Sequence, residues 1–174
     1  MKKNLFSLFA LVCMALCLSG CGSDEPETTV TASATYQIDF SDDLIDVASV
    51  AVVYVADNGQ VSIETVNPTT KQWLKRVSYT IKGKEKSTDF GFKVVYTLKG
   101  NELTDETYDL KADAKITATT PTSSRIFEES LMDANATKAN KVAETVSRNS
   151  NKAFGVTVTK EGSIERNSGF TVSI

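Results

Sequence analysis

The sequence predicts a mainly β protein, an antiparallel β-sandwich with one long helix (about 124–148) packed on it. Apolar and polar residues alternate along several segments that turn residues separate, and this pattern is typical of half-buried strands. Residues 124–148 differ, because their apolar side chains recur every three or four positions, as on one face of a helix. About eight strands at this spacing favour a sandwich.

The alternation is clearest in residues 31–40, where every second side chain is apolar. Further strands are expected at 73–81, 90–98, 112–118 and 154–158, with a closing strand at 170–174 beside the last of these. Lys75 is a misfit, because it stands on the apolar face of its strand.

Residues 49–56 are apolar on both faces of the expected strand. Such a strand is usually covered on both sides, and the helix at 124–148 is the simplest second cover. Asp57-Asn58-Gly59 predicts a tight hairpin turn, because Asn and Gly accept a positive φ at low cost. The returning strand is then expected at 61–65.

The predicted helix has a start signal and a stop signal. Ser123 or Ser124 can cap its first turn, and Glu128 and Glu129 favour the positive end of its dipole. Asn149-Ser150-Asn151 is expected to end it. A helix of about 24 residues would be roughly 36 Å long.

The start of the chain, residues 1–20, has the pattern of a secretory leader. Lys2 and Lys3 precede the apolar stretch Leu5–Leu18, which is shorter than the roughly 20 residues of a membrane-spanning helix. Leu18-Ser19-Gly20-Cys21 resembles the lipobox of bacterial lipoproteins. This resemblance implies cleavage before Cys21, acylation of that cysteine and attachment to a membrane by the acyl chains.

An acidic stretch follows this cysteine. Gly22-Ser23-Asp24-Glu25-Pro26-Glu27 is similar to the sequence after the lipidated cysteine of Bacteroidota surface lipoproteins. The similarity implies an outer-membrane protein that faces the cell exterior, and a solvated linker at the periplasmic face is the alternative. We therefore divide the chain into a signal peptide (1–20), an acidic tether (21–29) and a single β-rich domain (30–174).

Composition excludes several kinds of chemistry. The chain has no histidine, which excludes Ser-His-Asp catalysis and histidine metal sites. Cys13 and Cys17 leave with the signal peptide, so the domain is expected to have no free thiol and no disulfide. The whole chain has 19 basic and 22 acidic residues and a formal charge of −3. Removal of the signal peptide takes away Lys2 and Lys3, so 17 basic residues remain and the formal charge becomes −5. No basic run indicates nucleic-acid binding, and no metal or cofactor is expected.

Carboxylates are the remaining acid–base groups. They form two clusters, Asp42, Asp43 and Asp46 in one and Asp105, Glu106 and Asp109 in the other. Two carboxylates across a cleft can hydrolyse a glycosidic bond or hold calcium. Neither cluster has the spacing of a calcium loop, and Asp is common in turns, so solvated turns are expected.

Four stretches are similar to small Bacteroidota surface lipoproteins of immunoglobulin-like or transthyretin-like sandwich type. They are Tyr36-Gln37-Ile38-Asp39-Phe40, Val52-Val53-Tyr54, Trp73-Leu74-Lys75 and Phe90-Gly91-Phe92-Lys93-Val94, within residues 30–99. The similarity implies a sandwich. A late helix before a closing strand also resembles a lipocalin-like barrel with a C-terminal helix, which is the alternative fold.

These observations predict a lipid-anchored, non-enzymatic binding module whose partner is an envelope protein or a glycan. Trp73 and Tyr108 are the candidate ligand-binding residues, because an aromatic ring can stack on a sugar. The alternation around Trp73 favours the core, whereas Tyr108 is expected to be exposed. One alternative is a structural or accessory subunit of a surface assembly such as a pilus, and another is a carboxylate-based glycan hydrolase.

Overall fold

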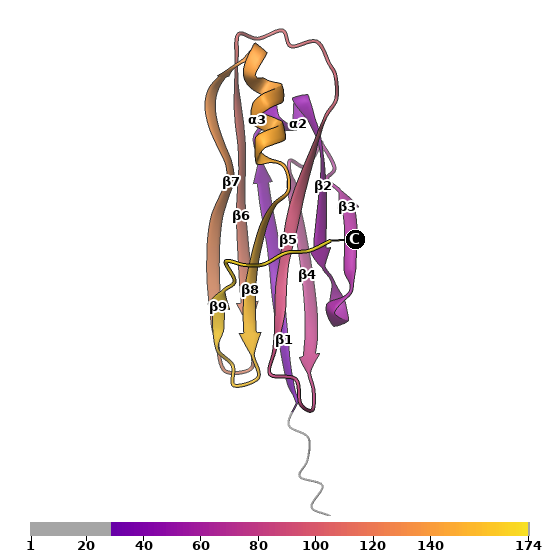
Figure 1. Cartoon of the computed structure of the whole chain (residues 1–174), viewed down its shortest axis with the longest axis vertical. Coiled ribbons are helices and arrows are strands. Elements are labelled where there is room, and N and C mark those ends of the chain that lie inside the picture. The colour runs from indigo at the N-terminus through magenta and orange to yellow at the C-terminus, as the bar shows by residue number, and fades with distance from the viewer. Residues whose placement is uncertain (1–28, 174) are drawn as a thin grey trace, which may run out of the picture.

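The computed structural model describes residues 29–173, which form two antiparallel sheets packed face to face (Figure 1). Sheet A has the strand order β4 (Gln72–Ile81), β1 (Val30–Phe40), β6 (Thr107–Thr119), β7 (Ser124–Lys138). Sheet B has the order β3 (Val61–Thr65), β2 (Ala48–Val55), β5 (Ser87–Leu98), β8 (Lys152–Thr159), β9 (Ile164–Arg166). The predicted β-sandwich is confirmed. The sheets do not close into a barrel, so the lipocalin-like alternative is wrong.

The helices are short. α2 (Asp42–Val47) joins β1 to β2 and buries Leu44, Ile45 and Val47. The predicted hairpin turn is confirmed as a short 3-10 segment, Asp57–Gly59, with a φ of 58° at Asn58 and 74° at Gly59. Another 3-10 segment, Ala139–Lys141, leads into α3 (Val142–Asn149), which packs at one end of the sandwich.

The inward faces of the two sheets meet in an aromatic cluster. Tyr36 of β1 stacks on Trp73 of β4 at 6.1 Å between ring centroids, with the planes only 11° apart. Phe92 of β5 makes a T-shaped contact with each ring, at 5.5 Å from Tyr36 and 5.9 Å from Trp73 between ring centroids. Edge-to-face and offset-stacked pairs are the arrangements that the charge distribution of aromatic rings favours, so this cluster stabilises the contact between the sheets.

The Tyr36 hydroxyl also connects the sheets through hydrogen bonds. The pairing of β2 with β5 ends at Tyr54 and Phe92, and the hydroxyl lies between the next two residues. It donates to the Val55 carbonyl at 2.9 Å and accepts from the Gly91 amide at 3.0 Å. One side chain of sheet A therefore satisfies two backbone groups of sheet B, which burial would otherwise leave unpaired.

The predicted helix over 124–148 is wrong for most of its length, because residues 124–138 form β7 and only 142–149 are α-helical. Two irregularities in the pairing of β6 with β7 explain the misleading pattern. Leu131 is an extra residue between the pairs Asp113–Ser130 and Ala112–Met132, and it is buried beside Met132. Such bulges lengthen the spacing of inward-facing side chains beyond two, so a bulged strand imitates helical periodicity.

The predicted strand 170–174 is also wrong within the described residues. β9 takes its place beside β8, and residues 167–173, here called the C-terminal strap, then cross the outer face of sheet B (Figure 1). Phe170 and Val172 form a small buried cluster with Val53 of β2. β2 is thus covered on both faces as predicted, but the strap and not a helix provides the outer cover.

A pair of glycines makes room for the strap. Gly91 of β5 lies opposite Gly155 of β8. A Cβ added at Gly91 would lie 2.7 Å from Phe170 Cε1, and one at Gly155 would lie 2.6 Å from Phe170 Cβ. These distances are too short for carbon atoms, so the two glycines form a slot, here called the Phe170 slot, which any larger residue would fill.

The two buried tyrosines should respond differently to loss of their hydroxyl. Tyr36→Phe should lower the free energy of unfolding by about 1–3 kcal/mol, because it leaves the Val55 carbonyl and the Gly91 amide unpaired. Tyr96→Phe is the matched control, because the Tyr96 hydroxyl is buried without a partner among the described residues. Its removal should change stability by less than about 0.5 kcal/mol or increase it. Urea unfolding of both variants measures this, and equal losses would contradict it.

The Phe170 slot should give a non-additive double-mutant cycle. Phe170→Ala should cost about 2–3 kcal/mol through lost burial. Gly155→Ala should cost a similar amount, because its methyl group displaces the same ring. The double variant should lose no more than either single variant, since the ring that collides is then absent. Chemical denaturation of the four proteins tests this, and additive losses would show that Gly155 acts independently of Phe170.

Candidate functional site

The structure buries both aromatic residues that the sequence singled out. Trp73 is 6% exposed in the aromatic cluster, as its alternation indicated. Tyr108 is also 6% exposed, and its hydroxyl accepts a hydrogen bond from the Asp105 amide at 3.0 Å. The expectation that Tyr108 is exposed is wrong. Neither ring presents a free face for stacking on a ligand.

The most densely bonded carboxylate in the described chain is Glu64 of β3. Its Oε1 accepts from the Tyr54 hydroxyl at 2.8 Å and from Lys75 Nζ at 2.5 Å, and its Oε2 accepts from Trp73 Nε1 at 3.0 Å. β3 belongs to sheet B and β4 to sheet A, so Glu64 joins the two sheets along one side of the sandwich. The Lys75 misfit now has a physical reason, because this lysine pairs with Glu64.

Glu64 is held in its ionised form. Its pKa is lowered, first by the hydrogen bond from Lys75 and then by those from Trp73 and Tyr54. The pKa of Lys75 is raised, mainly by the same bond with Glu64. The pKa of Tyr54 is raised, first by desolvation and then by its bond to Glu64. A carboxylate with a lowered pKa and three donors is a weak base, so this cluster is suited to joining the sheets and not to proton transfer.

The two acidic clusters predicted as turns meet at one end of the sandwich. Asp43 in α2 accepts from the Asp109 amide at 2.6 Å, and Asp109 accepts from the Ala136 amide at 2.8 Å. Asp42 pairs with Lys71 at 2.6 Å. These carboxylates bind backbone amides and a lysine, which are structural roles. Across residues 29–173, no group of three or more His, Cys, Asp or Glu side chains is arranged to hold a metal ion.

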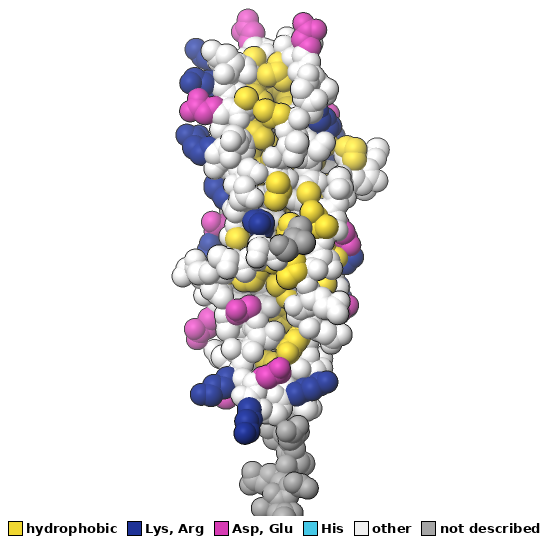
Figure 2. Space-filling view, turned by 45° about the vertical axis from the view of Figure 1, so that its right-hand side comes forward, with side chains coloured by type: hydrophobic (Ala, Val, Ile, Leu, Met, Phe, Trp, Pro, Cys, Tyr) yellow, Lys and Arg dark blue, Asp and Glu magenta, His cyan; other side chains and the backbone are white. Residues whose placement is uncertain are grey.

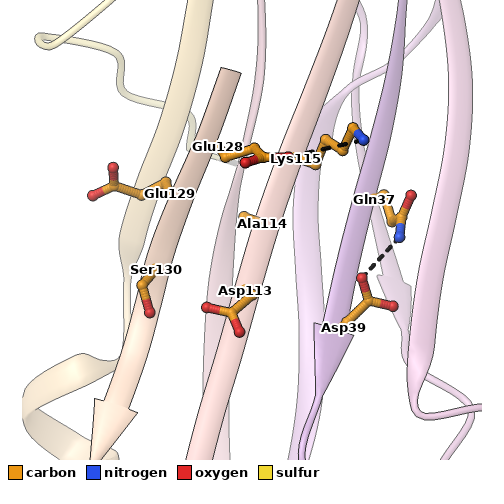
Figure 3. Close-up of a pocket in the computed structure, with 8 residues that line it drawn as sticks. All are labelled: Gln37, Asp39, Asp113, Ala114, Lys115, Glu128, Glu129 and Ser130. Carbon is orange, nitrogen blue, oxygen red and sulfur yellow. Dashed lines mark hydrogen bonds and ion pairs between the residues drawn. The ribbon is translucent and has the colours of Figure 1, made fainter. Parts of the chain in front are cut away.

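The outer face of sheet A has a polar depression of about 550 Å³ over β1, β6 and β7 (Figure 3). The lining residues are Gln37, Asp39, Asp113, Ala114, Lys115, Glu128, Glu129 and Ser130. Three of its four carboxylates have partners: Asp39 binds Gln37 and Gln72, Glu128 pairs with Lys115, and Glu129 pairs with Arg166. No aromatic side chain lines the depression, so it offers no stacking surface to a sugar.

Cys21 lies outside the described residues. β1 begins at Val30, at the same end of the sandwich as the turns that join β4 to β5 and β8 to β9 (Figure 1). In the described part of the chain, no helix combines the length and the apolar character needed to cross a membrane.

Comparison with protein-family models, with curated proteins and with solved structures finds no significant match to this chain. Sequence reasoning missed Glu64, although the inward-facing Lys75 was a usable signal, because a lysine on an apolar face requires an acidic partner nearby.

The Glu64 cluster predicts a pH-dependent stability difference. Glu64→Gln should lower the free energy of unfolding by at most about 1 kcal/mol at neutral pH, because more than a third of the Glu64 side chain is exposed. Because the pKa of Glu64 is lower in the folded than in the unfolded state, its ionised form stabilises the fold at pH values above the ordinary pKa of 4.5. This stabilisation is lost as the pH falls below that value and Glu64 takes up a proton. The difference between wild type and variant should therefore shrink below about pH 4.5.

Urea unfolding from pH 3 to pH 8 measures this difference. Glu161→Gln is the matched control, because Glu161 is an exposed acid in the turn between β8 and β9. It should give no comparable pH-dependent difference. A Glu64→Gln difference that stayed constant down to pH 3 would contradict the assignment.

Proposed function

We propose that this protein is a lipid-anchored, non-enzymatic interaction module of the bacterial outer membrane, with its domain facing the cell exterior. The observation that carries the proposal is Cys21, which ends a lipobox-like motif only nine residues before β1. Acyl chains on Cys21 would hold the protein by its N-terminal side. The partner is then an envelope protein or a glycan.

The end of the sandwich at which β1 begins supports this orientation. Lys82, Lys84, Lys86 and Lys160 lie in the two turns at this end, against Glu85 and Glu161 (Figure 2). Lys160 connects the turns, because its amide donates to the Lys86 carbonyl at 2.7 Å and its Nζ to the Gly83 carbonyl at 2.6 Å. An excess of lysine suits a surface next to anionic headgroups. Eight residues, 22–29, at about 3.3 Å each allow a separation of at most about 26 Å from the anchor.

The polar side chains of the domain support a non-enzymatic role. Glu64, Asp43 and Asp109 are occupied in holding strands together, and the chain has no histidine. A carboxylate-based glycan hydrolase needs two acids that face each other across a cleft. In the two predicted clusters, Asp43 and Asp109 instead bind backbone amides, and Asp42 pairs with Lys71.

A subunit of a surface assembly is the second candidate, and the edge strand β3 favours it. Val61 and Ile63 of β3 are 42% and 55% exposed, beside a strand edge that pairs with no other strand among residues 29–173. An exposed apolar edge strand is a surface to which another chain can add a strand.

Cys21→Ala should abolish membrane attachment. In a bacterial expression host, the wild-type chain should incorporate labelled fatty acid and sediment with outer membranes, whereas the variant should do neither. Cys17→Ala is the matched control, because Cys17 lies within the apolar part of the signal peptide. Acylation of the Cys21→Ala variant would overturn the proposal. Protease added to intact cells should digest the wild-type domain if it faces outward, and protection would assign it to the periplasmic face.

The same two strains, wild type and Cys21→Ala, can be used to identify a binding partner. Crosslinking in intact cells should recover a stoichiometric envelope partner with the wild type and not with Cys21→Ala, because the unanchored variant is no longer held at the membrane. Binding to a glycan array by the purified domain, without a protein partner, would favour the glycan.

A further inference from the structure

The C-terminal strap is a separate covering piece on sheet B. After β9 the chain turns and crosses the outer side of β8 and β5 toward β2 and β3 (Figure 1). Phe170 is 8% exposed and Val172 is 7% exposed, so both side chains are almost completely buried. The strap therefore covers an apolar strip of the outer face that includes the Phe170 slot, and this strip is here called its groove.

The groove is shaped for this segment. The Phe170 slot accepts one aromatic ring. Val172, two residues further along the strap, belongs with Phe170 to the buried cluster that contains Val53 of β2. Val55 and Val95 line the cluster as partly buried neighbours. The sheet thus fits an extended segment that has an aromatic residue at one position and an aliphatic residue two positions later.

Few polar bonds hold the strap. The Asn167 amide donates to the Gly155 carbonyl at 2.9 Å. The Gly169 and Phe170 amides both donate to Asn167, within the strap itself. Beyond Asn167, the described hydrogen bonds do not tie the strap to the sheet, so Phe170 and Val172 provide most of its attachment. Such a segment can leave its groove without breaking the strand ladder.

The surface around the strap is self-complementary. Val61 and Ile63 of β3 continue the apolar band across this face, and Figure 2 shows hydrophobic side chains along this side of the molecule. Along β2, β3 and β5, the outward positions carry only two charged residues, Asp89 and Lys93, which have opposite signs. Gly91 lies midway between them. A two-fold axis near Gly91 would place Asp89 of one copy opposite Lys93 of the other.

We propose that two copies of this chain exchange their C-terminal straps, so that Phe170 of each copy fills the Phe170 slot of the other. The exchanged segment makes the same side-chain contacts as before, which is why swapping an identical element is an economical route to a dimer. Ser168 and Gly169 are exposed and form the hinge. With Asn167 still bound to Gly155, the three steps from Asn167 to Phe170 span about 10 Å, which matches the spacing of sheets packed face to face. That packing also covers Val61 and Ile63.

Two matched variants separate the chain that donates its strap from the chain that provides the slot. Gly155→Ala closes the slot and keeps an intact strap, so this chain can only donate. Phe170→Ala keeps the slot and loses the ring, so this chain can only accept. Both are made in the mature chain, residues 21–174, with Cys21→Ser, so the result does not depend on membrane attachment or on the proposed function.

Sedimentation velocity measures the outcome. The wild type should show a dimer fraction that rises with concentration. Each variant loses the contact between ring and slot in its monomer and in its homodimer alike, so neither homodimer should be tighter than that of the wild type. Only the mixed pair regains one such contact, so an equimolar mixture should form a heterodimer at least about 30-fold tighter than either homodimer. Circular dichroism checks that each variant is folded. A wild type that stays monomeric at every concentration overturns the proposal, as does a heterodimer that persists when both partners carry Phe170→Ala.

A second measurement needs no substitution at the slot. Isotope-labelled and unlabelled mature chains, each with a photo-crosslinking residue in place of the exposed Thr171, are mixed and irradiated. Crosslinks that join the strap of one isotope to β5 or β8 of the other support the exchange. Crosslinks within single chains only, at concentrations where the wild type is dimeric, would show that the dimer uses another surface and would overturn it.

Discussion

The hydroxyl of Tyr36 lies where sheet A, the end of the β2–β5 pairing and the Phe170 slot come together. It binds the Val55 carbonyl and the Gly91 amide, and Gly91 is one of the two glycines that receive Phe170. The ring below this hydroxyl stacks on Trp73 and contacts Phe92. One side chain therefore takes part in the contact between the sheets and also binds the backbone of sheet B that carries the Phe170 slot.

The charged and polar side chains at the edges of the sandwich mostly serve the architecture. The Asp57 carboxylate accepts a hydrogen bond from the Ser78 amide at 2.7 Å, so this backbone amide on the edge of β4 already has a partner. On the opposite side, Arg125 of β7 donates to the Ile164 carbonyl of β9 at 3.0 Å. Natural sheets need such devices, because a free edge invites pairing with other chains. β3 instead exposes the apolar side chains of Val61 and Ile63.

Part of the fold was predictable because strand alternation is a local property. β1, β2 and the hairpin at Asp57–Gly59 follow directly from residue order and turn chemistry. β7 was not predictable in this way, because the extra residue Leu131 shifts its inward-facing positions to a spacing that imitates a helix. The bulge exists only because β6 pairs with β7, and no local pattern reports that pairing.

The candidate site shows the same limit. Lys75 on an apolar face indicated that an acid lies nearby, but only the placement of β3 beside β4 identified Glu64. The alternation around Trp73 indicated a core residue, whereas Tyr108 lies in the part of β6 before the strand expected at 112–118, and β6 carries it into the core.

The sequence by itself determined the strand-rich character of the domain, the absence of histidine from the chain and of cysteine after residue 21, and the lipobox-like motif at Cys21. These properties depend on composition or on neighbouring residues. Tertiary structure decided which distant residues meet: Glu64 with Lys75, Tyr36 with Gly91, and Phe170 with Gly155. The physical reason is that such contacts depend on strand order and register, which the whole chain sets when it buries its apolar faces.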